Sequence, residues 1–231
     1  MKTLGIIGGV GPQTTAKVYL SVIDHIRHSG SEAYPGIVIY NLPFPFSVEN
    51  EAIVQGINSE KMIPYLIDGA KKLEISGATF GILPCNTLHK YIENIRESVK
   101  IPFLSIVEES VKTLQNSQVK TVGILASQTT IDSDIYGSKL NANNIATIYP
   151  DKSEQQDINN IIIEIINGKN SESLLIKIAN IIESLNKKGA DCILLACTDL
   201  QIVTSGNKFS LPVYDTTEIL IKSSVNELKL S

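Results

Sequence analysis

Two cysteines, Cys85 and Cys197, occupy matching places in the two halves of the chain. Each ends an apolar run and precedes small polar residues, Asn86-Thr87 in one case and Thr198-Asp199 in the other. A thiolate can take a proton from carbon, and a thiol can return one. Two thiols on opposite faces of one substrate carbon are therefore candidates for a pair of acid/base groups.

Both cysteines are expected where a strand gives way to a helix. In open α/β sheets, ligands bind beyond the carboxyl ends of the strands. Exposed amides and the helix dipole at such a place favour anions and lower the pKa of a thiol from about 8.5 toward neutrality. A cysteine at a strand end can also simply pack, but the repetition and the polar neighbours favour function for Cys85 and Cys197. Cys192 lies within its strand, its counterpart is Phe80, and we interpret it as core packing.

The two cysteines belong to an internal repeat. Three pairs of segments match in the same order, at offsets of 118, 112 and 110 residues: Lys2–Ile7 with Lys120–Leu125, Gly77–Leu88 with Gly189–Leu200, and Ile101–Leu104 with Leu211–Tyr214. We therefore expect two similar α/β units of about 110 residues, one formed by residues 1–103 with 212–231 and the other by 104–211. If these units pack about a pseudo-twofold axis, the two cysteines approach one cleft from opposite sides.

The elements that must position the cysteines follow from the hydrophobic pattern. Short runs rich in Ile, Val and Leu alternate with segments of helical periodicity, which predicts mainly parallel sheets flanked by helices, the α/β class. Strands are expected at 4–7, 37–40, 79–83, 103–106, 121–125, 146–149, 192–195 and 213–214. Helices are expected from Pro12 onward and around 59–76, 87–99, 107–116, 154–167, 171–187 and 216–228. Ser153 with Gln156 suggests a capping box.

The composition excludes several classes of protein. The chain has 231 residues, 43% of them apolar, with a net charge of −4 and no cluster of basic residues. Disorder and a disulfide-stapled miniprotein are excluded, and neither nucleic acid nor a membrane is an expected partner. No apolar run approaches the ~20 residues of a bilayer span, and no signal peptide is evident. We expect a soluble, cytoplasmic protein whose three cysteines are free thiols.

Cofactor motifs are weak. Gly9–Thr14 begins like a dinucleotide fingerprint, but Thr14 stands where the third glycine belongs, and the second strand ends in Tyr40-Asn41 without an acidic residue. The backbone of Gly9, Val10 and Gly11 is better suited to a small anionic ligand such as a carboxylate.

Metal and hydrolase motifs are also lacking in the sequence. The Cys192/Cys197 and His25/His28 spacings do not match a zinc site. Neither a nucleophile elbow nor a Walker phosphate loop is present. We therefore expect neither a metal nor another cofactor.

Three motifs carry a family resemblance: Gly5–Pro12, Pro84–His89 and Ala196–Asp199. With them the chain resembles the aspartate/glutamate racemase family over nearly its whole length. The resemblance implies two pseudo-symmetric α/β domains with the active site at their interface, and interconversion of amino-acid enantiomers without pyridoxal phosphate or metal. It also implies that Cys85 and Cys197 are the catalytic cysteines.

The resemblance extends to substrate binding. Asn86, Thr87 and Thr198 match positions that hold the substrate in the family, and Ser127 and Thr130 match its second-domain substrate loop.

The chain departs from the family pattern at three places. Asp199 stands where Glu is common, which makes it an accessory candidate. The segment Asn41–Glu51 lacks the Arg of aspartate-specific members, and Asn167 replaces their Lys. In this segment, Phe44 or Phe46 would favour an uncharged substrate side chain, whereas Glu49 or Glu51 could meet a basic one.

These observations predict a cofactor-independent amino-acid racemase that uses Cys85 and Cys197 in a two-base mechanism. One alternative is another two-cysteine isomerase or lyase of the same superfamily, acting on hydantoins or maleate. Another is a non-catalytic, two-lobed protein that binds small molecules. The sequence leaves open which amino acid is the substrate, with aspartate and glutamate among the options. It also leaves open which cysteine serves which enantiomer, and the oligomeric state, with a homodimer as one option.

Overall fold

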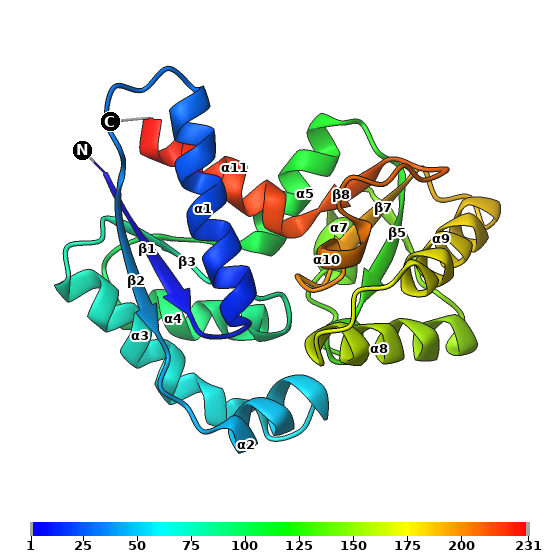
Figure 1. The fold of residues 1–231 in the computed structure, drawn as a ribbon, viewed down its shortest axis with the longest axis horizontal. Coiled ribbons are helices and arrows are strands. Elements are labelled where there is room, and N and C mark those ends of the chain that lie inside the picture. Colours follow the sequence, from blue (N-terminus) through cyan, green and yellow to red (C-terminus); the bar gives the residue numbers. More distant parts are fainter. Residues whose placement is uncertain (1, 230–231) are drawn as a thin grey trace. The chain divides into compact units, whose positions relative to one another are not determined.

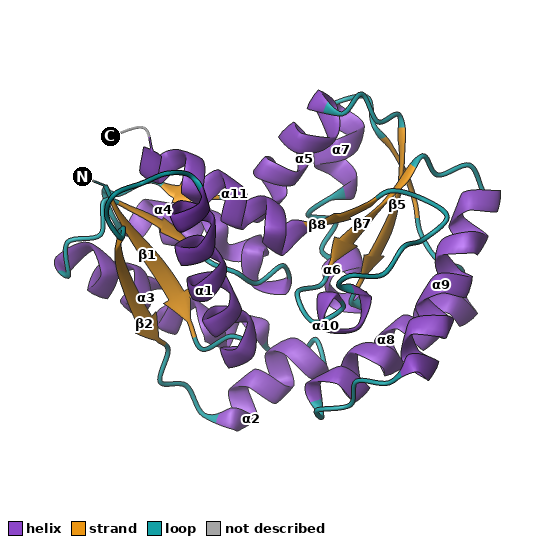
Figure 2. Ribbon diagram, turned by 45° about the horizontal axis from the view of Figure 1, so that its top comes forward, coloured by secondary structure: helices purple, strands orange, loops and turns teal. Residues whose placement is uncertain are grey.

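The chain forms two compact α/β units. The computed structural model describes residues 2–229. Unit 1 contains the residues up to Glu109 together with those from Thr217 onward, and unit 2 is Ser110–Thr216 (Figure 1). Each unit holds a four-stranded sheet in which every paired neighbour is parallel, and Figure 2 shows both sheets flanked by helices. The predicted α/β class is confirmed.

Unit 1 has the strand order β2-β1-β3-β4. Its strands are β1 (Thr3–Gly8), β2 (Gly36–Asn41), β3 (Phe80–Ile82) and β4 (Phe103–Leu104). Its helical segments are α1 (Pro12–His28), α2 (Phe46–Glu49), the π-helical η1 (Asn50–Val54), the 3₁₀ turns η2 (Ser59–Met62) and η3 (Thr87–Tyr91), α3 (Ile63–Ile75) and α4 (Ile92–Ser98). Most of α11 (Thr216–Lys229) and the start of α5 (Ile106–Asn116) also belong to it.

Unit 2 repeats this topology with the order β6-β5-β7-β8. Its strands are β5 (Thr121–Ala126), β6 (Ala146–Ile148), β7 (Cys192–Ala196) and β8 (Val213–Asp215). Its helices, besides the rest of α5, are α6 (Gln128–Asp132), α7 (Gly137–Ala142), α8 (Lys152–Ile166), α9 (Glu172–Lys187) and α10 (Gln201–Thr204). In both units the first strand in sequence lies between the second and the third, so the repeat seen in the sequence is also a repeat of the fold.

One glycine in each repeat shows why the sequence similarity persists. A Cβ on Gly5 would lie 2.9 Å from Ala78 Cβ and 3.2 Å from Leu73 Cβ on α3. At the matching position of unit 2, a Cβ on Gly123 would lie 2.8 Å from Ile193 Cδ1 and 3.1 Å from Leu185 Cδ1 on α9. The central strand of each sheet therefore needs a glycine where its covering helix packs closely.

The expected strands are all present, with ends that differ by no more than two residues. The predicted capping box is wrong: Asp151, not Ser153, caps α8. Its Oδ1 accepts hydrogen bonds from the amides of Ser153 and Glu154 at 2.9 Å, and its own amide donates to Glu154 Oε2 at 2.8 Å. The helix thus begins at Lys152, two residues before the expected start.

The boundary between the units also differs from the expected one. The second unit was expected to span residues 104–211, but it starts at Ser110. In the structure β8 pairs with β7 through Val213, Tyr214 and Asp215, and unit 2 runs to Thr216.

None of the helices within residues 2–229 has the length and apolar character of a membrane span.

Candidate functional site

Cys85 lies three residues beyond β3 in a tight turn. Its amide donates to the Leu83 carbonyl at 2.9 Å across Pro84, whose fixed φ suits such a three-residue turn. The Cys85 residue is 7% exposed, and the neighbouring Asn86 and Thr87 are also buried. The turn therefore brings one thiol and two polar side chains to the carboxyl end of the unit 1 sheet.

Cys197 directly follows β7 at the carboxyl end of the unit 2 sheet. It is half-buried, and its Sγ donates to Asp199 Oδ2 at 3.8 Å. Burial raises the pKa of the Asp199 carboxyl, and the hydrogen bond from the Cys197 thiol opposes that rise. Thr198 between them is 8% exposed. Cys197 therefore has a carboxyl partner within its own loop.

The expectation of a helix directly after each cysteine is confirmed for Cys85 and wrong for Cys197. After Cys85, the 3₁₀ turn η3 continues directly into α4, close to the expected range 87–99, whereas Cys197 is followed by a turn and then by α10, which has four residues. A helix macrodipole needs a longer run of aligned peptides than the four residues of α10. Asp199 is a titratable neighbour that contacts the Cys197 thiol.

Cys192 is a packing residue, as predicted. It is 1% exposed within β7, and burial, followed by the charge of Asp191, raises the pKa of its thiol to about 12. A thiol in that environment is neither a base nor a nucleophile at neutral pH.

Part of the glycine loop after β1 makes contacts within the chain. Gly9 and Gly11 have φ of 93° and 74°, and a Cβ on Gly9 would lie 3.0 Å from the Leu42 amide nitrogen. The Gly9 amide donates to Thr15 Oγ1 at 3.2 Å, and Val10 is buried in the unit 1 core. The expectation that all three amides are open to an anion therefore does not hold for Gly9.

Ser127 and Thr130 are brought together at the carboxyl end of β5. Ser127 is the N-cap of α6, where its Oγ accepts from the Thr130 amide at 3.3 Å and lies 3.0 Å from Thr130 Oγ1. Gln155, which is not among the predicted site residues, donates from Nε2 to the Ala126 carbonyl at 2.9 Å. Its position on the buried face of α8 follows from helical periodicity, but its contact with this loop does not.

In the segment after β2, some of the candidate specificity side chains contact other residues of the chain. Phe44 packs edge-on against Tyr65, with ring centroids 6.1 Å apart. Glu51 pairs with Lys61 at 2.8 Å and accepts from Asn58 at 3.1 Å, and the hydrogen bond from Lys61 lowers the pKa of this carboxyl most strongly. Phe46, by contrast, is 88% exposed. Of these aromatic side chains, Phe46 is the one left for an external contact.

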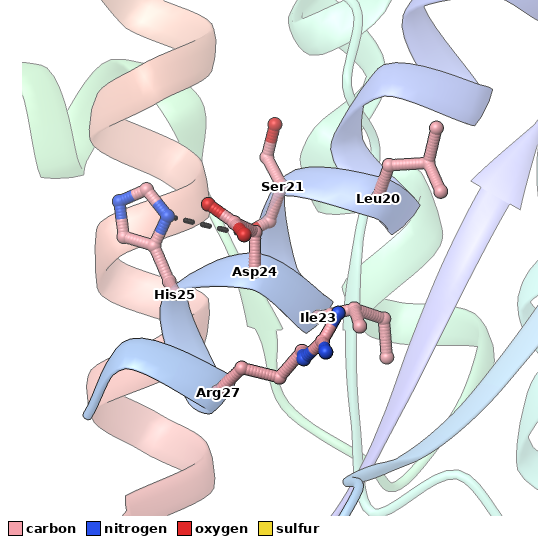
Figure 3. A pocket seen from close by; sticks show the side chains of 6 residues that line it. All are labelled: Leu20, Ser21, Ile23, Asp24, His25 and Arg27. Atoms are coloured by element: carbon pink, nitrogen blue, oxygen red, sulfur yellow. Dashed lines mark hydrogen bonds between the residues drawn. The ribbon is translucent and has the colours of Figure 1, made fainter. Parts of the chain in front are cut away.

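A shallow surface pocket lies away from these loops, along the second half of α1 (Figure 3). It is lined by Leu20, Ser21, Ile23, Asp24, His25 and Arg27. His25 Nδ1 lies 3.1 Å from the Ser21 carbonyl oxygen, and its Nε2 lies 3.2 Å from Glu218 Oε1. Because α1 starts at the carboxyl end of the sheet and runs back along it, this pocket does not belong to the candidate site. Across residues 2–229, no cluster of three or more His, Cys, Asp or Glu side chains could hold a metal ion.

Comparison with known proteins identifies the family of the chain. The family model for Asp/Glu/hydantoin racemase matches residues 7–223. The chain belongs to this family. The resemblance stated from the sequence and the assignment to an enzyme family of racemases are thereby confirmed.

Relatives of this racemase family match over almost the whole chain. A broad-specificity amino-acid racemase of Bacillus subtilis (strain 168) is 34% identical over 227 residues, which are 96% of each chain. The solved structure of an aspartate racemase homologue from Pyrococcus horikoshii OT3 superposes with a TM-score of 0.83, at 26% identity, over 99% of this chain and 100% of that one. The aspartate racemase of Picrophilus torridus gives a TM-score of 0.76 at 26% identity, over 99% and 95% of the two chains.

Proposed function

We propose that this protein is a cofactor-independent amino-acid racemase in which Cys85 and Cys197 act on opposite faces of the substrate α-carbon. The observation that carries the proposal is the equivalence of the two thiols. Each follows the third strand of its sheet, at the edge where α/β folds bind ligands. The curated relative at 34% identity is itself an amino-acid racemase, which supports the same conclusion.

The proposed reaction has two proton transfers. One cysteine, as the thiolate, takes the α-proton; the C–H bond breaks, and its electron pair stays on the substrate as a planar carbanion. The other cysteine, as the thiol, gives its proton to the opposite face and becomes a thiolate. The substrate leaves with inverted configuration, and the two cysteines have exchanged protonation states. No redox step or additional reactant is required.

Polar groups around each thiol can stabilise the carbanion. Asn86 and Thr87 on one loop and Thr198 on the other offer donors for the substrate carboxylate, and charge developing there is stabilised by such pre-positioned donors. The Ser127–Thr130 pair offers two hydroxyls at the next strand end. We assign these residues to substrate binding, together with the backbone of Val10 and Gly11.

Asp199 adds a proton acceptor to one side of the reaction. Its Oδ2 already accepts from the Cys197 thiol. When Cys197 acts as the base it must first lose its proton, and Asp199 is positioned to receive that proton and pass it to the solvent before the thiolate reacts. The accessory role suggested by the sequence thus becomes acid/base assistance to Cys197.

The substrate we propose has an uncharged side chain. A second carboxylate would require a cationic partner in a closed site. Residues Asn41–Glu51 contain no Lys or Arg, and Lys61, which the fold brings to this segment, is paired with Glu51. The broad specificity named for the Bacillus subtilis relative agrees with a site that does not demand a dicarboxylate.

The test is a substrate panel run in D₂O. Each L-amino acid is incubated with purified protein, and both α-deuteration and the appearance of the D-enantiomer are followed by chiral chromatography with mass detection. Racemisation with one deuterium gained per inversion supports the proposal, and Cys192→Ala serves as a thiol control that should retain it. A panel without exchange, combined with turnover of hydantoins or maleate, would instead support another isomerase or lyase. Ligand binding that survives loss of both thiols, without any exchange, would indicate a binding protein.

A further inference from the structure

The buried histidine of the chain has no task in the mechanism above. The sequence contains three histidines, at positions 25, 28 and 89. His89 is 2% exposed, whereas His25 is half-buried and His28 is exposed. His89 lies on η3, four residues after Cys85 and inside the same sequence motif. A buried polar ring needs hydrogen-bond partners, and the partners of this ring lie close to a proposed catalytic thiol.

Both ring nitrogens of His89 contact main-chain atoms. Nε2 lies 3.0 Å from the amide nitrogen of Ile106, which can only donate. Nδ1 lies 2.7 Å from the carbonyl oxygen of Cys85, which can only accept. Nε2 is therefore the unprotonated nitrogen, and Nδ1 carries the proton. The hydrogen bonds define a neutral ring in a single tautomer.

These two bonds tie together the ends of neighbouring strands. Cys85 lies just beyond β3, and Ile106 begins α5 just beyond β4. The two strands are paired, with Ile82 opposite Leu104. The Ile106 amide belongs to the first turn of α5, where amides lack partners within the helix, so the imidazole supplies a missing acceptor. If Nε2 of His89 carried a proton, two N–H donors would face each other at the helix start. The contact with the Ile106 amide therefore favours the neutral imidazole.

We propose that His89 is a positioning residue that fixes the direction of the Cys85 thiol. The amide of Cys85 is held by the Leu83 carbonyl and its own carbonyl is held by His89 Nδ1, so both peptide groups that flank its Cα are fixed. That backbone sets the direction of the Cα–Cβ bond and the rotamers open to the thiol. The matching position in the repeat, four residues after Cys197, is Gln201, which is 3% exposed. Each half of the molecule thus carries a long polar side chain at this place. The inference rests on the proposed function, because it assumes that Cys85 transfers a proton.

The first test does not depend on activity. Long-range ¹H–¹⁵N correlation spectra of the ¹⁵N-labelled protein at pH 7 report which nitrogen of each imidazole carries the proton. The His89 signals are identified by elimination, using His25→Gln and His28→Gln variants. We expect His89 to have a protonated Nδ1 and an unprotonated Nε2. A proton on Nε2 would overturn the inference.

The second test separates positioning from stability. His89→Leu removes both bonds, while His89→Asn keeps a donor near the position of Nδ1. We expect kcat of the Leu variant to fall at least tenfold with KM within threefold of wild type, and kcat of the Asn variant to return to within threefold. The alkylation rate of Cys85, measured relative to that of Cys197 in the same molecule, should change in the Leu variant only. Ile95→Val, which removes a buried methyl from the same unit, controls for lost stability.

Two outcomes bear on the inference in opposite ways. A folded His89→Leu variant with unchanged kcat and an unchanged alkylation ratio would overturn it. Protein that shows the expected tautomer and the altered Cys85 reactivity, yet racemises no amino acid, would contradict the proposed function and leave the positioning role intact. If neither His89 variant folds, the tautomer in the wild-type protein decides.

Discussion

Replacing the carboxyl group beside Cys197 should make the protein more stable and its thiol more reactive, but the enzyme slower. In Asp199→Asn the side-chain volume is kept and the negative charge is removed. The 3.8 Å between Cys197 Sγ and Asp199 Oδ2 sets the scale. Two unit charges at that separation repel by about 1 kcal/mol in bulk water and by about 4 kcal/mol at an effective dielectric constant of 20. Even the lower value corresponds to a roughly fivefold larger thiolate population.

The stability change follows from the direction of the pKa shift. Burial raises the pKa of Asp199 above its ordinary value of 3.8, so the folded protein binds a proton more readily than the unfolded chain. Stability is therefore lost as the pH rises from about 3.8 through the raised folded pKa. Asp199→Asn removes this cost, and its gain in Tm over wild type should be larger at pH 7 than at pH 4.5.

The assay measures both thiols in one molecule. Iodoacetamide labelling at pH 7, followed by peptide mass spectrometry, gives the rate at Cys197 relative to Cys85. We expect that ratio to rise about fivefold or more in Asp199→Asn, while kcat falls because the thiol has lost its proton acceptor. Asp199→Glu should keep most of the activity. Asp191→Asn is the matched control: this aspartate, at the opposite end of β7, accepts from the Lys120 and Thr121 amides at 3.0 and 2.8 Å. An Asp199→Asn variant with unchanged labelling and unchanged kcat would refute the argument.

Three further predictions concern packing and specificity. Cys192→Ala should lower the free energy of unfolding, measured by urea titration, by roughly 1–3 kcal/mol, because it leaves a small cavity. The kcat of this variant should be unchanged. A loss of activity in the folded variant would contradict the structural role of Cys192. Gly5→Ala should lower the free energy of unfolding by about 1–3 kcal/mol, measured by urea titration, because its Cβ would lie 2.9 Å from that of Ala78; a variant as stable as wild type would contradict this clash. The value of kcat/KM for L-aspartate should not exceed that for uncharged amino acids by 100-fold, about 2.7 kcal/mol; a larger preference would imply a cationic partner and refute the inference from Asn41–Glu51.

The sequence was most informative where periodicity and repetition act together. The α/β class and the strands follow from apolar runs, because a strand buried on both faces must be apolar throughout. The glycines at positions 5 and 123 matched in the alignment of the two halves because each lies under a closely packed helix. The cysteine loops could be placed at strand ends for the same reason, since the apolar run stops where the strand does.

Details that depend on tertiary contacts could not be predicted. Short segments such as α2 and α10 have too few residues for a helical period to show. The cap of α8 shifted to Asp151 because a carboxylate accepts from two amides at once there. The bond of His89 to Ile106 joins residues 17 positions apart, through a ring whose partner is a backbone amide. The pattern of side chains in a sequence does not predict a backbone amide as the partner of a histidine.

The pairing of Lys61 with Glu51 illustrates the same limit for substrate recognition. A count of charges in the segment after β2 shows two glutamates and no cation, but the fold brings Lys61 against Glu51 at 2.8 Å. Of the two carboxylates considered for a basic substrate, Glu51 is thereby neutralised. The aromatic candidates divide in a similar way, because Phe44 packs on Tyr65 and Phe46 stays exposed.

The two-base claim is tested most directly by α-hydrogen exchange in single-cysteine variants. Cys85→Ala and Cys197→Ala are each incubated in D₂O with one enantiomer of the best substrate, then with the other, and deuteration is measured separately from inversion. Because the carbanion must be reprotonated from the face opposite abstraction, we predict that each variant loses at least about 100-fold in racemisation. Any exchange that survives in a variant should be confined to one enantiomer and should occur with retention, on opposite enantiomers in the two variants. Racemisation at a wild-type rate in either variant would contradict the two-base mechanism.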